Sequence, residues 1–138
     1  MANVIAVIMA GGVGARFWPR SREKTPKQLL EIVGPRTMIQ NTVKRLEGLV
    51  DGKQIFVVTN KSQKALVIKQ LSNVPPQNVL VESVSRNTAP CMGLAALFIP
   101  RLDPRAVVLA LPADHIIADV EEYQRVLRLA IEVAEDSG

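Results

Sequence analysis

Four short apolar runs, separated by longer stretches with helical periodicity, define the architecture of this chain. The runs are Val4–Met9, Ile55–Thr59, Val79–Val81 and 106–111. Apolar runs without polar interruption indicate strands that are buried on both faces of a parallel sheet. Apolar residues at helical spacing predict helices over 38–49, 63–71, 89–99 and 121–135.

The last predicted helix has the clearest signals at its ends. Asp119 precedes it as a candidate N-cap, and the acidic residues that follow complement the helix dipole. An apolar stripe is predicted at Tyr123, Val126, Leu127, Ala130 and Ala134. We expect this stripe to pack against the sheet.

Buried strands that alternate with helices predict an α/β fold, a Rossmann-like three-layer αβα sandwich with a mainly parallel sheet. Ligands of such sheets bind outside the carboxyl ends of the strands, so the segments after Met9, Thr59, Val81 and Leu111 should matter most. The first of these segments, 11–36, is much longer than an ordinary connection between a strand and a helix. Long connections in compact domains are usually functional.

Composition narrows the class of ligand. The 138 residues suffice for one domain, and 48% hydrophobic content can fill its core. Only 4% of the residues are aromatic, which argues against a stacking platform for single-stranded nucleic acid. The net charge is +4, and segment 16–27 carries all of it, with five basic residues and one acid. Charge gathered in one loop favours a compact anion, such as a phosphate chain, over a nucleic acid.

A single cysteine, Cys91, allows neither an internal disulfide nor a cysteine-based metal cluster, which fits a reducing cytoplasm. No apolar run approaches the roughly 18 residues of a membrane span. Residues 2–10 are apolar but have no basic leader or cleavage site, so a signal peptide is not expected.

The glycine-rich stretch Gly11-Gly12-Val13-Gly14-Ala15-Arg16 follows the first predicted strand. It matches neither the P-loop pattern nor the dinucleotide fingerprint, because Phe17 stands where each requires a glycine. Glycines let backbone N–H groups approach a ligand, but a plain turn before a solvated basic loop remains an alternative. Arg16 and Lys27 are the candidates to neutralise a triphosphate. Of Arg20, Arg22 and Lys24, one or two should be solvated surface residues.

Two later motifs follow predicted strands. Asn87 or Thr88 can cap the third predicted helix, and the polar groups there could also contact a nucleobase. Asp114 comes just after the fourth run, where a carboxylate and phosphate oxygens commonly hold Mg²⁺; a structural hydrogen-bonding role is the alternative. His115 is the only histidine, so a zinc site is not expected, and Cys91 is expected in the core.

Together these motifs resemble a known family. The stretches "MAGGVGARFWPRSREKTPKQLL", "SRNTAP" and "LPADHII", in this order, are similar to the sugar-nucleotide pyrophosphorylases, and in particular to the bacterial mannose-1-phosphate guanylyltransferase branch. The similarity covers essentially the whole chain. It implies a nucleotide-diphospho-sugar transferase fold and a reaction in which mannose 1-phosphate and GTP give GDP-mannose and pyrophosphate.

The resemblance also implies roles for individual residues. Arg16 would hold the leaving pyrophosphate, Lys27 would lie near the α-phosphate, and Asp114 would hold Mg²⁺. The groups expected to surround the nucleotide, with Arg16, Lys27 and Asp114 among them, also include Ala10, Gly11, Gly12, Gly14, Asn87, Thr88 and Ala89. Members of the family continue beyond a segment of this length. We therefore expect residues 1–138 to be the nucleotide-binding part of a truncated domain that lacks most of the sugar pocket and is weakly active or inactive alone.

Other functions remain open at this point. A related pyrophosphorylase could use another base or sugar, and a non-catalytic nucleotide-binding module would carry the same motifs. A nicotinamide oxidoreductase is disfavoured by the broken glycine fingerprint. The partners that the resemblance implies are GTP and mannose 1-phosphate, without nucleic acid or membrane, and assembly into a homo-oligomer stays open.

Overall fold

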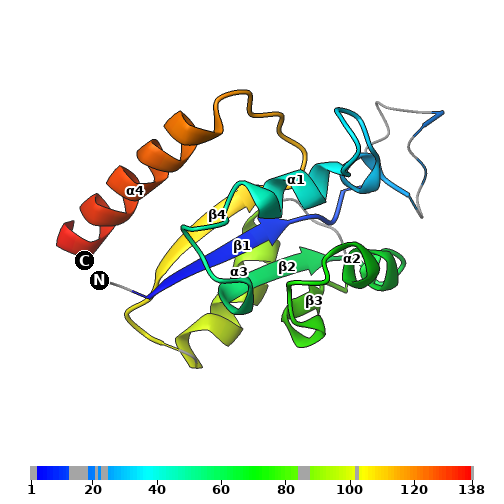
Figure 1. Cartoon of the computed structure of the whole chain (residues 1–138). Helices are drawn as coiled ribbons and strands as arrows, with labels where there is room; N and C mark the ends of the chain where they lie inside the picture. Colours follow the sequence, from blue (N-terminus) through cyan, green and yellow to red (C-terminus); the bar gives the residue numbers. More distant parts are fainter. Residues whose placement is uncertain are drawn as a thin grey trace.

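The computed structural model describes residues 3–12, 19–20, 22, 25–83, 88–101 and 103–137. Its centre is a sheet of four parallel strands in the order β3-β2-β1-β4 (Figure 1). The strands are β1 (Val4–Met9), β2 (Ile55–Thr59), β3 (Val79–Val81) and β4 (Val107–Pro112). The first three have the predicted bounds, and β4 is shifted by one residue toward the C-terminus.

Helices alternate with the strands, as the sequence pattern predicts. The α-helices are α1 (Met38–Lys44), α2 (Lys64–Gln70), α3 (Thr88–Phe98) and α4 (Val120–Ser137). Short 3-10 helices occur as η2 (Lys27–Leu29), η3 (Gly52–Gln54), η4 (Pro76–Asn78) and η5 (Ile99–Arg101). η2 divides the long connection after β1, and η5 extends α3.

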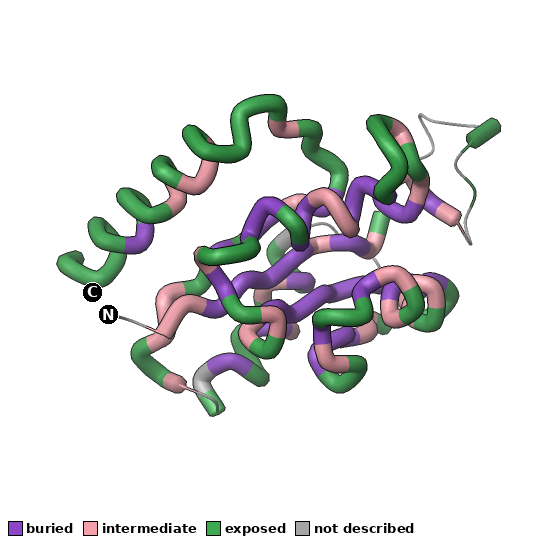
Figure 2. The backbone as a smooth tube through the Cα atoms, viewed as in Figure 1, coloured by how far each residue is buried: buried purple, intermediate pink, exposed green. Residues whose placement is uncertain are grey.

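Side chains from alternate positions of the strands fill two hydrophobic cores, one on each face of the sheet. On one face, Ala6 and Ile8 of β1 pack with residues of α1, α2 and α4. On the other, Ile5 and Val7 pack with Cys91 and further residues of α3 and η5. The three layers confirm the predicted αβα sandwich, and Figure 2 shows the strands as its most buried part.

The first α-helix is shorter than predicted. It begins after Thr37, whose hydroxyl and Gln40 form a reciprocal capping box, and it ends at Lys44 instead of continuing through residue 49. Turns follow, in which Leu46 donates to the carbonyl of Val43. Gly48 has a φ of 79°, a left-handed backbone conformation that ends regular helix.

The stripe predicted on the last helix is only partly correct. Asp119 does cap α4, because its Oδ1 accepts a hydrogen bond of 2.9 Å from the backbone N–H of Glu122. The inward positions are Tyr123, Leu127 and the buried Ile131, whereas Val126, Ala130 and Ala134 are exposed. The helix thus contacts the sheet along a narrow i, i+4 line, and most of its residues are coloured as exposed in Figure 2.

The strand order creates a switch in direction between β1 and β4. The chain steps outward from β1 to β2 and β3, and α3 then leads it back across the sheet to β4 on the other side of β1. Ligands of open parallel sheets bind in the crevice at the carboxyl ends of the strands where the order reverses. The fold therefore points to the ends of β1 and β4 before any residue is considered.

Gly52, in η3 just before β2, provides a test of the packing. A Cβ placed on this glycine would overlap the backbone oxygen of Asn73 and lie 3.2 Å from its carbonyl carbon. We expect Gly52→Ala to lower the free energy of unfolding by about 1–3 kcal/mol, because one backbone segment must move. Urea unfolding measures this difference. Gly93→Ala in α3, where no described atom lies within 4 Å of the added carbon, is the matched control; equal effects of both variants would contradict the packing.

Within the described residues, every helix is too short or too polar to serve as a transmembrane span.

Candidate active site

The glycine-rich turn and Asp114 follow two neighbouring strands. Met9 of β1 is in register with Pro112 of β4, and the backbone N–H of Ala113 donates to the carbonyl of Met9 at 3.3 Å. The glycine-rich turn begins directly after Met9 with Ala10, and Asp114 follows Ala113. The two motifs therefore meet at the switch point that the strand order defines.

Lys27 reaches the same place from η2. Its Nζ lies 3.6 Å from Oδ2 of Asp114, an ion pair between two residues that are 87 positions apart (114 minus 27) in the sequence. The Lys27 side chain is 23% exposed and that of Asp114 is 47% exposed, so both charges remain accessible to a ligand from solution. The structure thus brings together two of the three residues predicted to be catalytic.

Four side chains hold the carbonyl groups of the glycine-rich turn. Gln28 Nε2 donates to the carbonyls of Ala10 at 2.9 Å and Gly12 at 2.8 Å. Thr59 Oγ1 also donates to Ala10, at 3.1 Å, and Asn60 Nδ2 donates to the carbonyl of Gly11 at 3.3 Å.

Gln63 contributes the fourth side chain, because its Nε2 lies 3.5 Å from the carbonyl of Gly12. Three successive carbonyl groups of the turn are therefore bonded to side chains from η2 and from the end of β2 and the segment after it.

Burial changes stepwise along the turn. Ala10 is buried, Gly11 is half-buried and Gly12 is exposed. No described atom lies within 4 Å of the position where a Cβ of Gly12 would stand. Among the described residues, nothing therefore blocks a close approach of a ligand to the backbone at Gly12.

The anchoring side chains were not among the predicted site residues. Gln28 directly follows Lys27 in the Pro-Lys-Gln stretch, and Thr59, Asn60 and Gln63 lie at the carboxyl end of β2, a position that the fold class marks as important. Their polar character at a strand end was the available signal. Nothing in the sequence showed that they bond to the backbone of another loop, which requires the tertiary fold.

Several predicted residues are not placed with these. Gly14, Arg16 and Asn87 lie outside the described residues. Thr88 begins α3 and Ala89 is exposed in its first turn. Because α3 follows β3, this turn lies at the carboxyl edge of the sheet, the same edge as the glycine-rich turn.

The other basic residues of the long connection bond within the loop. Arg20 Nη2 donates to the carbonyl of Glu31 at 3.3 Å, and Arg22 Nε donates to that of Pro19 at 3.1 Å. Both residues are exposed. This agrees with the expectation that one or two of the basic residues belong to the solvated surface; Lys24 lies outside the described residues.

His115 lies beside Asp114, whereas Cys91 lies in the core. The His115 side chain is exposed, and its Nε2 is 4.0 Å from Asp114 Oδ1. The described residues contain no group of three side chains suited to binding a metal ion. Cys91 is buried in the core as predicted, and its burial, together with the nearby charge of Glu82, raises the pKa of its thiol to about 11. The thiol is therefore protonated at neutral pH.

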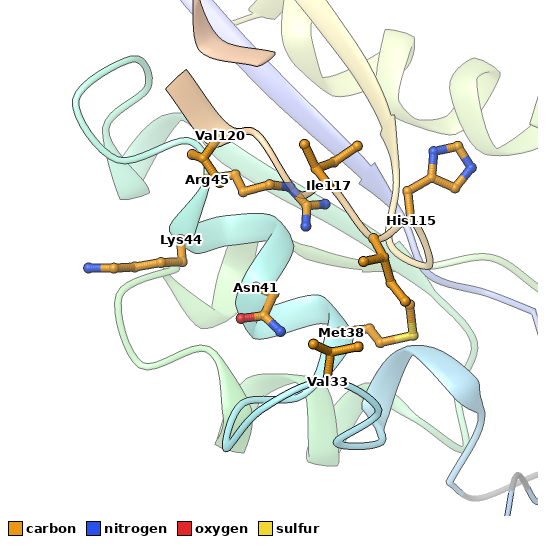
Figure 3. A pocket seen from close by; sticks show the side chains of 9 residues that line it. Val33, Met38, Asn41, Lys44, Arg45, His115, Ile117 and Val120 are labelled. Carbon is orange, nitrogen blue, oxygen red and sulfur yellow. The ribbon is translucent and has the colours of Figure 1, made fainter. Parts of the chain in front are cut away.

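A hollow of about 410 Å³ lies beside the site, between α1 and the segment that links β4 to α4 (Figure 3). Arg45 projects into it; burial lowers the pKa of this guanidinium, which lies 5.7 Å from the Tyr123 ring. Of the residues predicted to bind nucleotide, none of those that the structure describes lines the hollow, which is bordered by Val33, Met38, Asn41, Lys44, Arg45, His115, Ile116, Ile117 and Val120. It is a neighbour of the charged site and not its centre.

Known proteins share both the sequence and the fold. The chain is 42% identical over 134 residues to a mannose-1-phosphate guanylyltransferase of Salmonella muenchen, and 42% identical over 135 residues to the alginate biosynthesis protein AlgA of Pseudomonas aeruginosa. These matches cover 94% and 96% of this chain. The chain spans only 28% of the length of each relative.

A solved structure supports the same grouping. The crystal structure of a Thermus thermophilus protein, described as a mannose-1-phosphate geranyltransferase, matches with a TM-score of 0.87 at 32% identity, over 96% of this chain and 38% of that one. The family model for nucleotidyl transferases matches residues 5–138. Since this match includes nearly the whole sheet and every described residue of the site, the chain belongs to the nucleotidyl transferase family.

Proposed function

We propose that this chain forms the nucleotide-binding part of an enzyme that converts mannose 1-phosphate and GTP to GDP-mannose and pyrophosphate. The observation that carries the proposal is the Lys27–Asp114 pair at 3.6 Å, at the switch point of the sheet and next to the glycine-rich turn. A cation for phosphate oxygens and a carboxylate for a metal ion are the two charges that nucleotidyl transfer needs in one place.

The reaction needs no protein nucleophile. A phosphate oxygen of mannose 1-phosphate attacks the α-phosphorus of GTP, a new P–O bond forms, and the bond from the α-phosphorus to the bridging oxygen breaks in line with it. Pyrophosphate leaves with the electron pair of that bond. Catalysis then consists of positioning the two phosphates and neutralising their charge.

The described residues divide these tasks. Lys27 donates to oxygens of the α-phosphate and of the incoming phosphate, and Ala10, Gly11 and Gly12 present the backbone against which the nucleotide lies. Thr88 and Ala89 begin a helix at the same edge, where they can border the base. The family motifs add three residues to those proposed to bind the nucleotide: Gly14, Arg16 and Asn87. Of these, Arg16 is proposed to bind the leaving pyrophosphate.

Asp114 is suited to Mg²⁺. Its carboxylate is about half exposed, and oxygen is the ligand that this ion prefers. Mg²⁺ commonly takes one or two carboxylates and obtains its other ligands from phosphate and water, and Asp114 supplies one such carboxylate beside the proposed phosphate site. When bound, the ion would neutralise negative charge on the phosphate oxygens. The role of Asp114 is then to hold the ion and to give up part of its pairing with Lys27.

Nucleotide preference tests the proposal directly. In calorimetric titrations of the chain with GTP, ATP, UTP and dTTP in the presence of Mg²⁺, we expect GTP to bind most tightly. Tighter binding of another triphosphate would refute guanylyl specificity and favour a related pyrophosphorylase. Failure of all four to bind would refute a nucleotide site.

Turnover separates an enzyme from a non-catalytic module. Because the chain spans 28% of its relatives, the assay uses a fusion in which it replaces the matching segment of the Salmonella relative. Release of pyrophosphate that requires both GTP and mannose 1-phosphate supports the enzyme, whereas binding without turnover supports the module. A cytoplasmic location is part of the proposal and is tested by cell fractionation; the oligomeric state, which the sequence leaves open, is measured by sedimentation.

A further inference from the structure

Two buried amide side chains connect the parts of the proposed site. Gln28 is 5% exposed and Gln63 is 0% exposed. Gln28 Nε2 lies 3.2 Å from Gln63 Oε1, in addition to its contacts with the carbonyls of Ala10 and Gly12. Gln63 Oε1 also lies 3.4 Å from Thr59 Oγ1, whose one hydrogen it shares with the nearer carbonyl of Ala10. We refer to Gln28 and Gln63 as the amide pair.

The neighbours of the amide pair fix its orientation. Backbone carbonyl oxygens can only accept hydrogen bonds, so the Gln28 atom between Ala10 and Gly12 must be the nitrogen. That nitrogen has only two hydrogens, and its shorter contacts are with the carbonyls of Ala10 and Gly12, so Gln63 Oε1 at 3.2 Å shares one of them. The Gln63 atom on this side is the oxygen, because its nitrogen there would set two donors against each other. This orientation turns Gln63 Nε2 toward the carbonyl of Gly12, at 3.5 Å. Each amide thus supports the orientation of the other.

The direction of the carbonyls determines the direction of the N–H groups. In a planar trans peptide the C=O of one residue and the N–H of the next point in opposite directions. The carbonyl of Ala10 points toward Gln28 and Thr59, so the N–H of Gly11 points away from them. Asn60 holds the carbonyl of Gly11 in the same manner, which turns the N–H of Gly12 away from Asn60.

The amide pair is also linked directly to Lys27. Lys27 and Gln28 are consecutive in η2, and they point to different places, one to Asp114 and the other to the glycine-rich turn. Movement of Gln28 would therefore displace both the turn and the cation. Gln63 lies in the segment that follows β2, and β2 is a fully buried strand. Through Gln63, the glycine-rich turn and η2 are therefore connected to a rigid part of the sheet.

We propose that the Gln28–Gln63 amide pair positions the nucleotide, by fixing the backbone of the glycine-rich turn at Ala10 and Gly12 and by fixing η2 so that Lys27 faces Asp114. This inference rests on the proposed function, because it assigns the two residues an effect on that reaction without contact with the substrate. They are positioning residues, not catalytic ones.

Substitution of Gln28 by Met keeps the length of the side chain and removes the donor. In the fusion with the Salmonella relative, we expect Gln28→Met to lower kcat/KM for GTP by about 10- to 100-fold, with kcat reduced as well as KM raised, because misplacement of catalytic groups affects the transition state. Gln63→Met should also lower kcat/KM for GTP. Gln28→His, which restores an N–H donor at similar reach, should recover part of the loss.

A matched control exists elsewhere in the chain. Gln124 Nε2 also donates to two backbone carbonyls, those of Arg45 at 2.8 Å and Glu47 at 3.0 Å, far from the glycine-rich turn in the sequence. Gln124→Met should lower the melting temperature of the chain by less than Gln28→Met, because Gln124 is only half-buried, and it should leave kcat/KM unchanged. Equal losses of kcat/KM in Gln28→Met and Gln124→Met would show a general effect of stability and would overturn the inference.

An NMR spectrum of the chain, in which each backbone N–H gives one signal, separates this inference from the proposed function. With ¹⁵N-glycine labelling, the sequence gives eight glycine signals. We expect Gln28→Met and Gln63→Met to shift those of Gly11 and Gly12, and Gln124→Met to leave them in place. If the wild-type fusion shows no turnover, the proposed function fails. The NMR spectrum of the chain then still shows whether the amide pair holds the glycine-rich turn. Unshifted Gly11 and Gly12 signals, or normal kcat/KM in both Gln28→Met and Gln63→Met, would overturn the role of the amide pair.

Discussion

Asp114→Asn is expected to lower kcat in the fusion by about 10²- to 10³-fold, corresponding to about 2.7–4 kcal/mol of transition-state stabilisation. The substitution preserves the shape of the side chain and removes its charge. An amide oxygen is a weaker ligand for Mg²⁺ than a carboxylate, so the dependence of GTP binding on Mg²⁺ should weaken in the same variant. Calorimetry with and without Mg²⁺ measures the second effect on the 138-residue chain itself.

Asp119→Asn is the matched control for this substitution. Asp119 lies five residues further along and caps α4 through a hydrogen bond from Glu122. Asparagine is an equally good N-cap, so this variant should retain both stability and activity. An equal fall in kcat for Asp114→Asn and Asp119→Asn would show that the loss comes from removing any negative charge in this region. It would contradict the role of Asp114 as a ligand of the metal ion.

The fold could be predicted from the sequence because its strands are strongly marked. The strands β1, β2 and β3 have the predicted bounds, since continuous apolar runs have few alternatives in a chain of this size. The predicted three layers follow from the alternation of strands and helices. The strand order did not follow from the pattern, because pairing is a tertiary property, and it is this order that places the switch point between β1 and β4.

The helices show where local patterns are insufficient. The apolar residues after Lys44 continue the helical spacing as far as residue 49, yet the chain turns there and Gly48 takes a left-handed conformation. On α4, Ile131 is buried while Val126 is 48% exposed, although both are apolar and β-branched. Only the position of the helix on the sheet decides which apolar side chain faces inward.

The candidate site also contains residues that the sequence predicted and residues that only the structure revealed. Asp114 and Lys27 were found from charge, position after a strand and family motifs, and the structure brings them together. Gln28 and Gln63 carry no charge, so the sequence marked them only as polar residues near Lys27 and after a strand, which is a weak signal. Their importance arises from long-range hydrogen bonds to the backbone of another segment, over 16 and 51 residues to Gly12.

Lys27→Met is expected to have an effect on kcat as large as that of Asp114→Asn, about 10²- to 10³-fold, because it removes a positive charge from the place where phosphate charge shifts during the reaction. The folded chain should lose less than about 1 kcal/mol of stability, since Asp114 is 47% exposed and water can solvate it. Pyrophosphate release by the fusion and urea unfolding of the chain measure the two effects. Lys44→Met, which removes an exposed lysine paired with Glu47, is the control.

The double variant decides how Lys27 acts. If Lys27 served only to orient Asp114, then Lys27→Met combined with Asp114→Asn would be no slower than Asp114→Asn alone. We expect the double variant to be slower than either single variant, because the lysine binds phosphate oxygens and the carboxylate binds the metal ion. Lys27→Arg should recover only part of the rate, since a guanidinium retains the charge but presents it as a wider planar fork. Wild-type kcat in Lys27→Met would contradict the proposed site altogether, because the ion pair with Asp114 would then be structural.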